Sequence, residues 1–260
     1  MEELLRIENL KAGFSTEEGY VAALRGLSLC INKSEIFALV GESGSGKTVT
    51  CMSILGLLPE GGEISGGSIY FAGKDLLKLS EKELLNVRGR EIGMVFQEPL
   101  LALNPVFNIG NQIMETLIFH LRISKKEARN MTLELFFKTG LPQPAEVIFR
   151  YPHQLSGGMR QRAMIAQALA CRPKILLADE PTSSLDVTIQ VQILNLFKKL
   201  RQELGISILL VTHDLSIVSF IADRIAIIKD GRIIETGPRD DIFNNPQDPY
   251  TKNLIEASLI

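Results

Sequence analysis

The segment FALVGESGSGKT, residues 37–48, decides the fold of this chain. Its first half is an apolar run typical of a buried strand, and Gly41–Thr48 match the pattern GxxxxGK[ST]. Small residues let the backbone wrap so that successive N–H groups point at phosphate oxygens. The apolar residues 47–58 then predict a buried helix whose N-terminus attracts anions. Strand, glycine loop and helix in this order predict a nucleotide-binding α/β protein and argue against a chance glycine turn.

The loop residues have separate expected roles. We expect Lys47 to reach the β- and γ-phosphates and the Thr48 hydroxyl to complete a Mg²⁺ shell. The other expected nucleotide contacts are Gly41, Glu42, Ser43, Gly44, Ser45, Gly46 and Val49.

Composition excludes several classes of protein. The chain has 260 residues, 45% of them hydrophobic, and its net charge is -2. This balance argues against a nucleic-acid binder that relies on a basic surface, and against intrinsic disorder. No uncharged stretch is long and apolar enough to span a bilayer, and the acidic N-terminus MEELLRIENL predicts no signal peptide. Three scattered cysteines are typical of a reducing compartment, so we expect a cytoplasmic protein.

The order of periodic segments predicts the architecture. Apolar strand runs at 92–96, 175–179 and 207–212 alternate with helical patterns, which favours a parallel sheet with crossover helices. The first 75 residues read mainly as strands, and Asp230-Gly231 inside RIAIIKDGRIIET predicts a type I′ hairpin. Between 98 and 158 strand runs give way to helical patterns, one of them opening at the capping box Ser124-x-x-Glu127, so we expect a helical insert there.

Two carboxylates follow the apolar strand ILLAD. Ligands of α/β proteins lie at the carboxyl ends of parallel strands, and adjacent side chains of a strand point in different directions. We therefore expect Asp179 to support Mg²⁺ and Glu180 to act as the general base on the attacking water. The alternative is a pair of solvated charges at a strand end.

The segment Leu155-Ser156-Gly157-Gly158 opens another helix and predicts a second anion site. With this segment the chain resembles the ATP-binding-cassette (ABC) ATPases, for which LSGG is diagnostic. The resemblance implies a P-loop NTPase fold of ABC type, with a mixed sheet, an antiparallel β subdomain and an inserted helical subdomain. It also implies head-to-tail cassette dimers, in which each ATP lies between one subunit's phosphate loop and the other's LSGG.

Further residues take roles from this resemblance. Gln97 matches the Q-loop glutamine, which touches Mg²⁺ and senses the membrane partner. Asp186 in Ser184-Leu185-Asp186 matches the D-loop at the dimer interface, and His213 matches the switch histidine at the γ-phosphate. Phe14 fits the adenine-stacking aromatic best by register, with Tyr20 second, and a plain core role remains open for either.

Three segments are similar to the peptide and nickel importer branch of the family: 97–105 (QEPLLALNP), 155–194, and 244–257 (NNPQDPYTKNLIEA). Glu98 replaces an aspartate of that branch and Asp248 replaces a histidine. Many peptide-importing relatives continue into a cysteine-containing extension that this chain lacks after Ile260, which tilts the expectation slightly toward nickel.

The resemblance implies one cassette over residues 1–260. Its expected parts are a catalytic core with the β subdomain (1–97 and 159–237), a helical subdomain (98–158) and a C-terminal tail (238–260). ATP and Mg²⁺ are the implied cofactors. Hydrolysis would power uptake of di- or oligopeptides or nickel through two membrane permease subunits, supplied by an extracytoplasmic binding protein. The expected partner is a second cassette, identical or homologous, and the expected place is the cytoplasmic face of the inner membrane.

Other interpretations account for fewer residues. Repair ABC ATPases carry a long coiled coil between their nucleotide halves, and no sustained heptads are found here. Translation factors carry two cassettes, and this chain has one phosphate loop. A module that binds ATP without hydrolysing it would not need Glu180 and His213. P-loop kinases and GTPases give LSGG no role, and a guanine-reading NKxD is absent. The cargo stays open, because importers of this kind select it elsewhere.

Overall fold

The computed structural model describes residues 2–17 and 19–258. The chain divides into unit 1, residues 1–84 with 205–260, and unit 2, residues 85–204. The division falls inside helix α2 (Glu81–Val87). No helix in the described ranges combines the length and the hydropathy needed to cross a bilayer.

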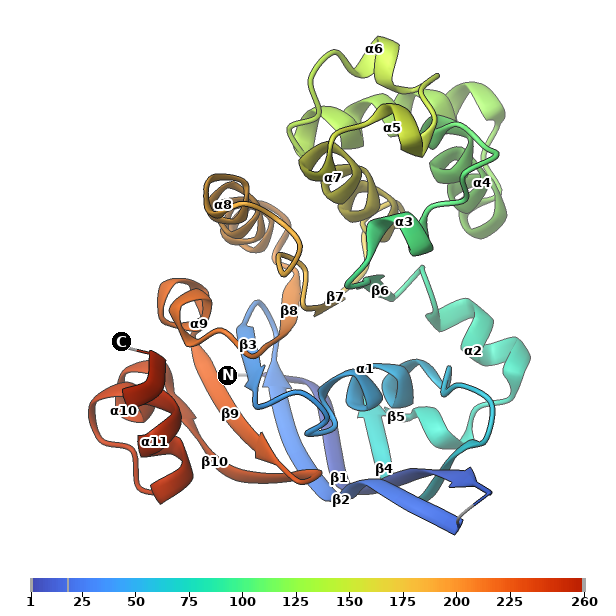
Figure 1. The fold of residues 1–260 in the computed structure, drawn as a ribbon. Helices are drawn as coiled ribbons and strands as arrows, with labels where there is room; N and C mark the ends of the chain where they lie inside the picture. Colours follow the sequence, from blue (N-terminus) through green and yellow to red (C-terminus); the bar gives the residue numbers. More distant parts are fainter. Residues whose placement is uncertain (1, 18, 259–260) are drawn as a thin grey trace. The chain divides into compact units, whose positions relative to one another are not determined.

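Unit 1 is built around strand β3 (Ile36–Val40), which is buried at all of its residues. β3 pairs in parallel with β8 (Ser207–Thr212) and with β9 (Arg224–Lys229), and β10 (Arg232–Pro238) pairs antiparallel with β9. Full burial of β3 and β8 agrees with the predicted apolar runs, because strands covered on both faces carry apolar residues at every position. Figure 1 shows the β9–β10 hairpin reaching back toward helix α1 (Lys47–Leu55).

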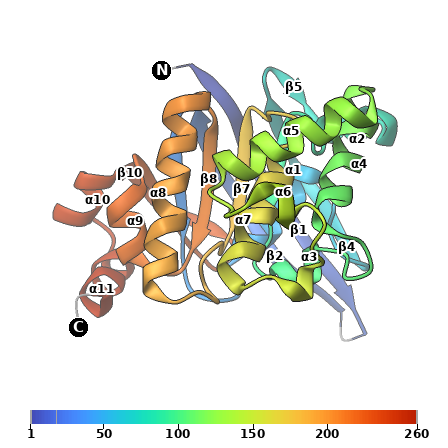
Figure 2. The same ribbon diagram turned by 90° about the horizontal axis from the view of Figure 1, so that it is seen from above.

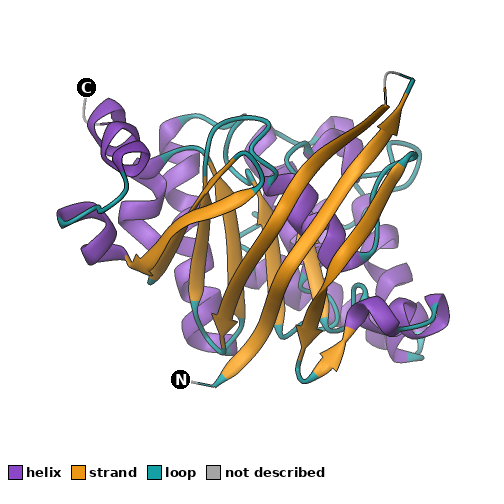
Figure 3. Ribbon diagram, turned by 90° about the horizontal axis from the view of Figure 1, so that it is seen from below, coloured by secondary structure: helices purple, strands orange, loops and turns teal. Residues whose placement is uncertain are grey.

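A second, antiparallel sheet in unit 1 has the order β2-β1-β4-β5. Its strands are β1 (Glu3–Thr16), β2 (Gly19–Asn32), β4 (Gly62–Phe71) and β5 (Lys74–Asp75), and the two longest run side by side in Figure 3. The β1–β4 register shifts between Glu8 and Lys11, and Gly67 (φ 96°) lies at this bulge. A Cβ on Gly67 would lie 2.6 Å from the Leu10 Cα, so glycine is required there.

The C-terminal helices of unit 1 pack against the β9 side of its sheet. Helices α9 (Leu215–Ile221), α10 (Arg239–Asn244) and α11 (Pro249–Ser258) lie together in Figure 2 and share an apolar cluster with β3 and β9. The Lys229 Nζ lies 4.4 Å from the centre of the Tyr250 ring, a cation–π contact that joins β9 to α11.

Glu235 of β10 ties the segment before α11 to the sheet, since its carboxylate accepts hydrogen bonds from the backbone N–H groups of Gln247 (2.8 Å) and Asp248 (3.1 Å). Burial alone would raise the pKa of Glu235, but the two N–H donors, the Thr251 side chain and the charge of Lys252 together outweigh burial and hold the pKa below its usual value. The stabilisation is therefore complete above the ordinary glutamate pKa of 4.5 and is lost as the pH falls through the lower pKa of the folded protein.

We predict that Glu235→Gln lowers the melting temperature at pH 7. In the acid range the difference in melting temperature between the variant and wild type should become smaller. A constant difference from pH 7 to pH 3 in calorimetry would contradict this role.

Unit 2 contains a helical cluster and two parallel strands. The helices are α3 (Pro99–Ala102), α4 (Ile109–Leu121), α5 (Lys125–Lys138), α6 (Pro144–Val147), α7 (Gly157–Ala168) and α8 (Val187–Leu204). Strand β6 (Ile92–Val95) pairs in parallel with β7 (Ile175–Asp179). Helices α4, α5 and α7 gather around a core that includes Phe136 (Figure 1). The predicted capping box is confirmed, because Ser124 accepts from the Glu127 N–H while the Glu127 carboxylate accepts from the Ser124 N–H.

Short 3₁₀ turns complete the two units: η1 (Leu76–Lys78) in unit 1 and η2 (Pro152–Gln154) in unit 2.

Candidate nucleotide-binding and hydrolysis site

The phosphate loop of unit 1 joins the end of β3 to the start of α1. Gly44 (φ 81°) and Gly46 (φ 107°) take left-handed conformations that favour glycine. A Cβ on Gly41 would lie 2.3 Å from the Ile228 carbonyl oxygen, so the backbone at the start of the loop is in close contact with β9. Helix α1 has no side-chain cap and no acidic residue in its first turn, which leaves its N–H groups for an anion.

Two polar side chains are buried in this loop. Lys47 is 5% exposed, and its Nζ donates to the carbonyl oxygens of Gly41 and Glu42, both at 2.9 Å. The Ser45 hydroxyl is buried and finds no hydrogen-bond partner within the described ranges. A buried cation beside an unsatisfied hydroxyl and helix N–H groups is a fit for phosphate oxygens. Thr48, the expected magnesium ligand, is exposed at the start of α1.

The tip of the β9–β10 hairpin braces the phosphate loop. Asp230 (φ 48°) and Gly231 (φ 74°) are both left-handed, which confirms the predicted type I′ turn. The Gly231 N–H donates to the Ser45 carbonyl at 3.0 Å, and the Arg25 N–H donates to the Gly231 carbonyl at 2.9 Å. The hairpin tip thus joins the phosphate loop to β2. No local sequence signal indicates this contact, since the bonded residues lie far apart in the chain.

Gly231→Ala tests this brace. A new Cβ would lie 2.3 Å from the Ala23 carbonyl oxygen, so the hairpin tip must move away from β2 and the loop. Gly73→Ala is the matched control, because Gly73 (φ 80°) also occupies a left-handed turn but a Cβ added there would meet no atom within 4 Å among the described residues. We predict that Gly231→Ala lowers the free energy of unfolding by about 1–3 kcal/mol more than Gly73→Ala in urea titrations. Equal losses of unfolding free energy in the two variants would mean that the hairpin tip accommodates the added methyl group without moving.

In unit 1, His213 follows β8 at the same edge of the sheet as the phosphate loop. β3 and β8 pair in parallel with Val40 opposite Thr212, so Gly41 and His213 are the next residues of adjacent strands. His213 is exposed, and the following Asp214 caps α9 by accepting from the Ser216 N–H at 2.8 Å. The imidazole is therefore held at the carboxyl end of β8, on the loop side of the sheet.

The two candidate aromatics lie on paired strands. Phe14 of β1 is half-buried, and a Cβ on Gly62 would lie 3.0 Å from its ring. Tyr20 of β2 is 47% exposed and covers Gly13, and its hydroxyl lies 3.5 Å from the Ser65 Oγ. Tyr20 offers more open ring surface, whereas Phe14 has more of the character of a packing residue.

In unit 2, the parallel pairing of β6 and β7 brings Gln97 to Glu180. Val95 of β6 is opposite Ala178 of β7, and Gln97 and Glu180 each lie two residues further along their own segments. The Gln97 Nε2 donates to the Glu180 Oε2 at 3.2 Å. Asp179 is 4% exposed, whereas Glu180 takes a left-handed conformation (φ 43°) in which the Ser183 N–H and hydroxyl donate to its carbonyl. The two carboxylates therefore have different surroundings, as the strand alternation predicts.

The LSGG segment of unit 2 opens helix α7. The Ser156 hydroxyl accepts from the Met159 N–H at 3.3 Å, which makes Ser156 the N-cap. A Cβ on Gly158 would lie 2.9 Å from Ile189, so the glycine allows α7 to approach the start of α8. Asp186 caps that neighbouring segment, since its carboxylate accepts from the Ile189 N–H at 3.0 Å. LSGG and the Asp186 segment therefore form one surface.

Comparison with known proteins decides the family. The family model described as "ABC transporter" matches residues 24–183, which include the phosphate loop, LSGG and both carboxylates. The chain belongs to the ABC transporter ATPase family. It is an ABC-type ATPase and binds ATP.

Individual relatives of this ABC ATPase cover nearly the whole chain. The dipeptide transport ATP-binding protein DppD of Bacillus subtilis is 50% identical over 256 residues, 98% of this chain and 76% of the relative. The oligopeptide transport ATP-binding protein OppD of the same organism is 50% identical over 255 residues, 98% of this chain and 71% of the relative. The post-hydrolysis dimer of the ATP-binding cassette MJ0796, bound to ADP and Pi, superposes with a TM-score of 0.81 at 32% identity, covering 91% of this chain and 99% of that one. The predicted fold class, a P-loop ABC domain with mixed and antiparallel sheets, is confirmed.

Proposed function

We propose that this ABC ATPase is the ATP-hydrolysing subunit of an importer for di- or oligopeptides. The observation that carries the proposal is 50% identity over 98% of the chain to two proteins named for dipeptide and oligopeptide transport. None of the relatives reported above is named for nickel transport. Nickel uptake therefore stays a prediction from the sequence, without support from these names. A role in DNA repair or translation has no support among them either.

The phosphate loop would hold the nucleotide. Lys47 would exchange its bonds to the Gly41 and Glu42 carbonyls for the β- and γ-phosphates, and the Ser45 hydroxyl would gain an acceptor. The N–H groups of Gly44, Gly46 and the first turn of α1 would complete the cradle. The remaining predicted contacts, Glu42, Ser43 and Val49, would line it, and Phe14 or Tyr20 would stack on adenine.

Thr48, Gln97 and Asp179 offer a hydroxyl, an amide carbonyl and a carboxylate, the hard oxygen donors that Mg²⁺ takes alongside phosphate oxygens. The Gln97 amide fits this role because its nitrogen donates to Glu180 and its carbonyl oxygen is a separate acceptor group. Bound Mg²⁺ would neutralise charge on the β- and γ-phosphates.

Glu180 would accept a proton from the water that attacks the γ-phosphorus, while the bond to the ADP oxygen breaks. Its hydrogen bond from Gln97 supports this assignment, because that bond fixes the carboxylate in one orientation. His213 would donate to a γ-phosphate oxygen, and its origin at the same strand edge as Gly41 supports that role. Catalysis would then consist mainly of positioning and charge stabilisation.

A second cassette, identical or homologous, would close each site. Ser156, Gly157 and Gly158 of one subunit would meet the γ-phosphate held by the other, and Asp186 would lie at the interface. The dimeric arrangement named for the similar MJ0796 cassette supports this. Closure would be a population shift driven by ATP, because only the closed pair makes both sets of contacts.

The helical segment 98–158 would receive a membrane permease, with residues 1–97 and 159–237 as the catalytic core and 238–260 as a tail. This division keeps the apolar cluster of α4 and α5 largely within one part. We infer two permease subunits and an extracytoplasmic peptide-binding protein as partners, with the cassette held peripherally at the cytoplasmic face of the membrane.

Reconstitution tests the cargo. The cassette, its co-purified permease and the binding protein are placed in liposomes, and ATP hydrolysis is measured with leucyl-leucine or tri-alanine and with Ni²⁺ chelates. The proposal predicts stimulation of several fold by peptides and none by Ni²⁺. Stimulation by Ni²⁺ alone would contradict it.

A further inference from the structure

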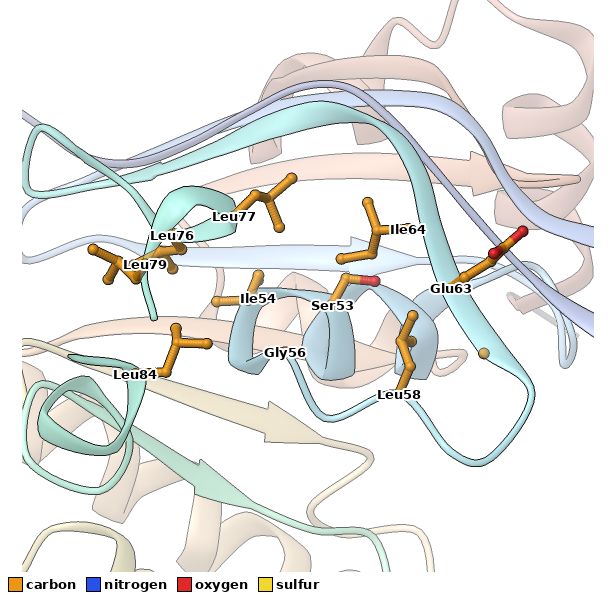
Figure 4. Close-up of a pocket in the computed structure, with 11 residues that line it drawn as sticks. Ser53, Ile54, Gly56, Leu58, Glu63, Ile64, Leu76, Leu77, Leu79 and Leu84 are labelled. Atoms are coloured by element: carbon orange, nitrogen blue, oxygen red, sulfur yellow. The ribbon is translucent and has the colours of Figure 1, made fainter. Parts of the chain in front are cut away.

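A pocket of about 390 Å³ lies in unit 1 between helix α1 and the β4–η1 region (Figure 4). No residue of the phosphate loop lines it, and Lys47 and Ser53 belong to opposite ends of α1. Its walls come from the C-terminal half of α1, from residues 58–64 before and along β4, and from four leucines within 76–84. The pocket is therefore separate from the nucleotide loop.

The pocket has an aliphatic end and a polar end. Leu76, Leu79 and Leu84 gather at one end in Figure 4, while Glu63 and the Ser53 hydroxyl lie toward the other. Among the described residues, none that lines the pocket is aromatic or basic, so the lining offers neither ring stacking nor a positive charge for an anion. These walls suit an unbranched or branched aliphatic chain.

The Ser53 hydroxyl is the observation that points to a ligand. Ser53 is 1% exposed, and its Oγ finds no hydrogen-bond partner in residues 2–17 and 19–258. A helical serine ordinarily relieves such burial by donating to the carbonyl four residues earlier, and this one does not. A buried hydroxyl without a partner loses its hydration free energy, and a polar group in the pocket would restore a hydrogen bond.

The charges at the polar end favour a cation. Glu63 supplies a carboxylate at the rim. Helix α1 ends at Gly56, its C-cap (φ 61°), which also lines the pocket, and the carboxyl end of a helix carries partial negative charge. The Ser53 oxygen can accept a hydrogen bond from an N–H donor. Glu63 and the helix end have the same sign, because both stabilise an ammonium and disfavour a carboxylate, whereas the Ser53 hydroxyl can accept from the one or donate to the other.

We propose that this pocket binds an aliphatic ammonium compound, with its chain among the leucines and its head group between Ser53 and Glu63. The ammonium can belong to a free alkylamine or to the amino terminus of a short aliphatic peptide. Hexylammonium and leucyl-leucinamide probe these two sources. Binding needs neither nucleotide nor permease, so its success or failure is independent of the proposed function in transport.

The test is a titration of the full-length chain, labelled with ¹³C at its isoleucine and leucine methyl groups, followed by NMR. Hexylammonium or leucyl-leucinamide is expected to shift the methyl signals of Ile54, Ile64 and Leu77 in a saturable way, with a Kd on the order of 1 mM. 1-Hexanol should bind more weakly by roughly two- to fivefold, and hexanoate should cause no saturable shift. No saturable shift with either ammonium probe, or binding of hexanoate as tight as that of hexylammonium, would overturn the proposal.

Variants separate the site from non-specific binding. Leu77→Trp should fill the pocket and abolish the shifts, whereas Leu85→Trp, at an exposed leucine that does not line the pocket, should leave them unchanged. Glu63→Gln, at an exposed position, should remove the preference for hexylammonium over 1-hexanol without affecting folding. Undiminished shifts in Leu77→Trp, or an undiminished preference in Glu63→Gln, would also overturn the proposal.

Discussion

Glu180→Gln is expected to leave ATP bound and to lower the rate of hydrolysis by about 10²- to 10⁴-fold, the usual contribution of a general base. Glutamine keeps the shape of the side chain and can still contact Gln97, but it cannot accept a proton from water at neutral pH. The expected result is a lowered kcat with an ATP Kd within a few fold of wild type. Phosphate release and equilibrium ATP binding are the two measurements.

Glu203→Gln is the matched control for this prediction. Glu203 lies near the end of α8, where its side chain is 51% exposed and paired with Lys199. Removing its charge should therefore change neither the rate of ATP hydrolysis nor the Kd for ATP. Turnover of Glu180→Gln within tenfold of wild type would remove Glu180 from the role of base. A parallel loss of ATP binding would instead make the carboxylate part of the binding site.

Lys47→Ala is expected to weaken ATP binding by about 2–5 kcal/mol, roughly 30-fold to several thousandfold. The reason is that its ammonium is buried among carbonyl oxygens in a loop whose other proposed phosphate contacts are mainly neutral N–H groups. Removing the ammonium leaves the phosphate charge with a weaker partner. Isothermal titration with MgATP measures the loss.

Lys199→Ala is the control for charge removal, because Lys199 is exposed on α8. The melting temperature of both variants without nucleotide separates binding from folding. An ATP affinity of Lys47→Ala within threefold of wild type would mean that the helix N-terminus alone holds the phosphates.

Local segments made much of the fold predictable. The run FALVG predicts a strand buried on both faces, and β3 is such a strand. The Ser124–Glu127 capping box and the Asp230-Gly231 turn were predictable because their residues are near neighbours whose bonding follows from residue type. The register of β6 and β7 also explains why the Gln97 Nε2 and the Glu180 Oε2 come within 3.2 Å.

Features that depend on distant contacts were not predictable in this way. The bond from Gly231 to Ser45 joins elements far apart in sequence, and the turn dipeptide carries no sign of its partner. The unpartnered Ser53 hydroxyl is equally hidden, because KTVTCMSIL reads simply as a buried helix. The turn between β4 and β5 is formed by Ala72 (φ 49°) and Gly73 (φ 80°), which are both left-handed. The pairing of Phe71 with Lys74 sets this turn, and the alanine gives no local signal of a left-handed conformation.

The central claim is that one ATP lies between the phosphate loop of one cassette and the LSGG segment of another. Photocleavage with vanadate tests it most directly, because vanadate trapped with MgADP takes the place of the γ-phosphate and, under ultraviolet light, cuts the backbone that touches it. In the purified transporter complex, this chain is predicted to be cut both within residues 41–48 and within residues 156–158. Cleavage confined to residues 41–48 under the same trapping conditions would contradict the claim.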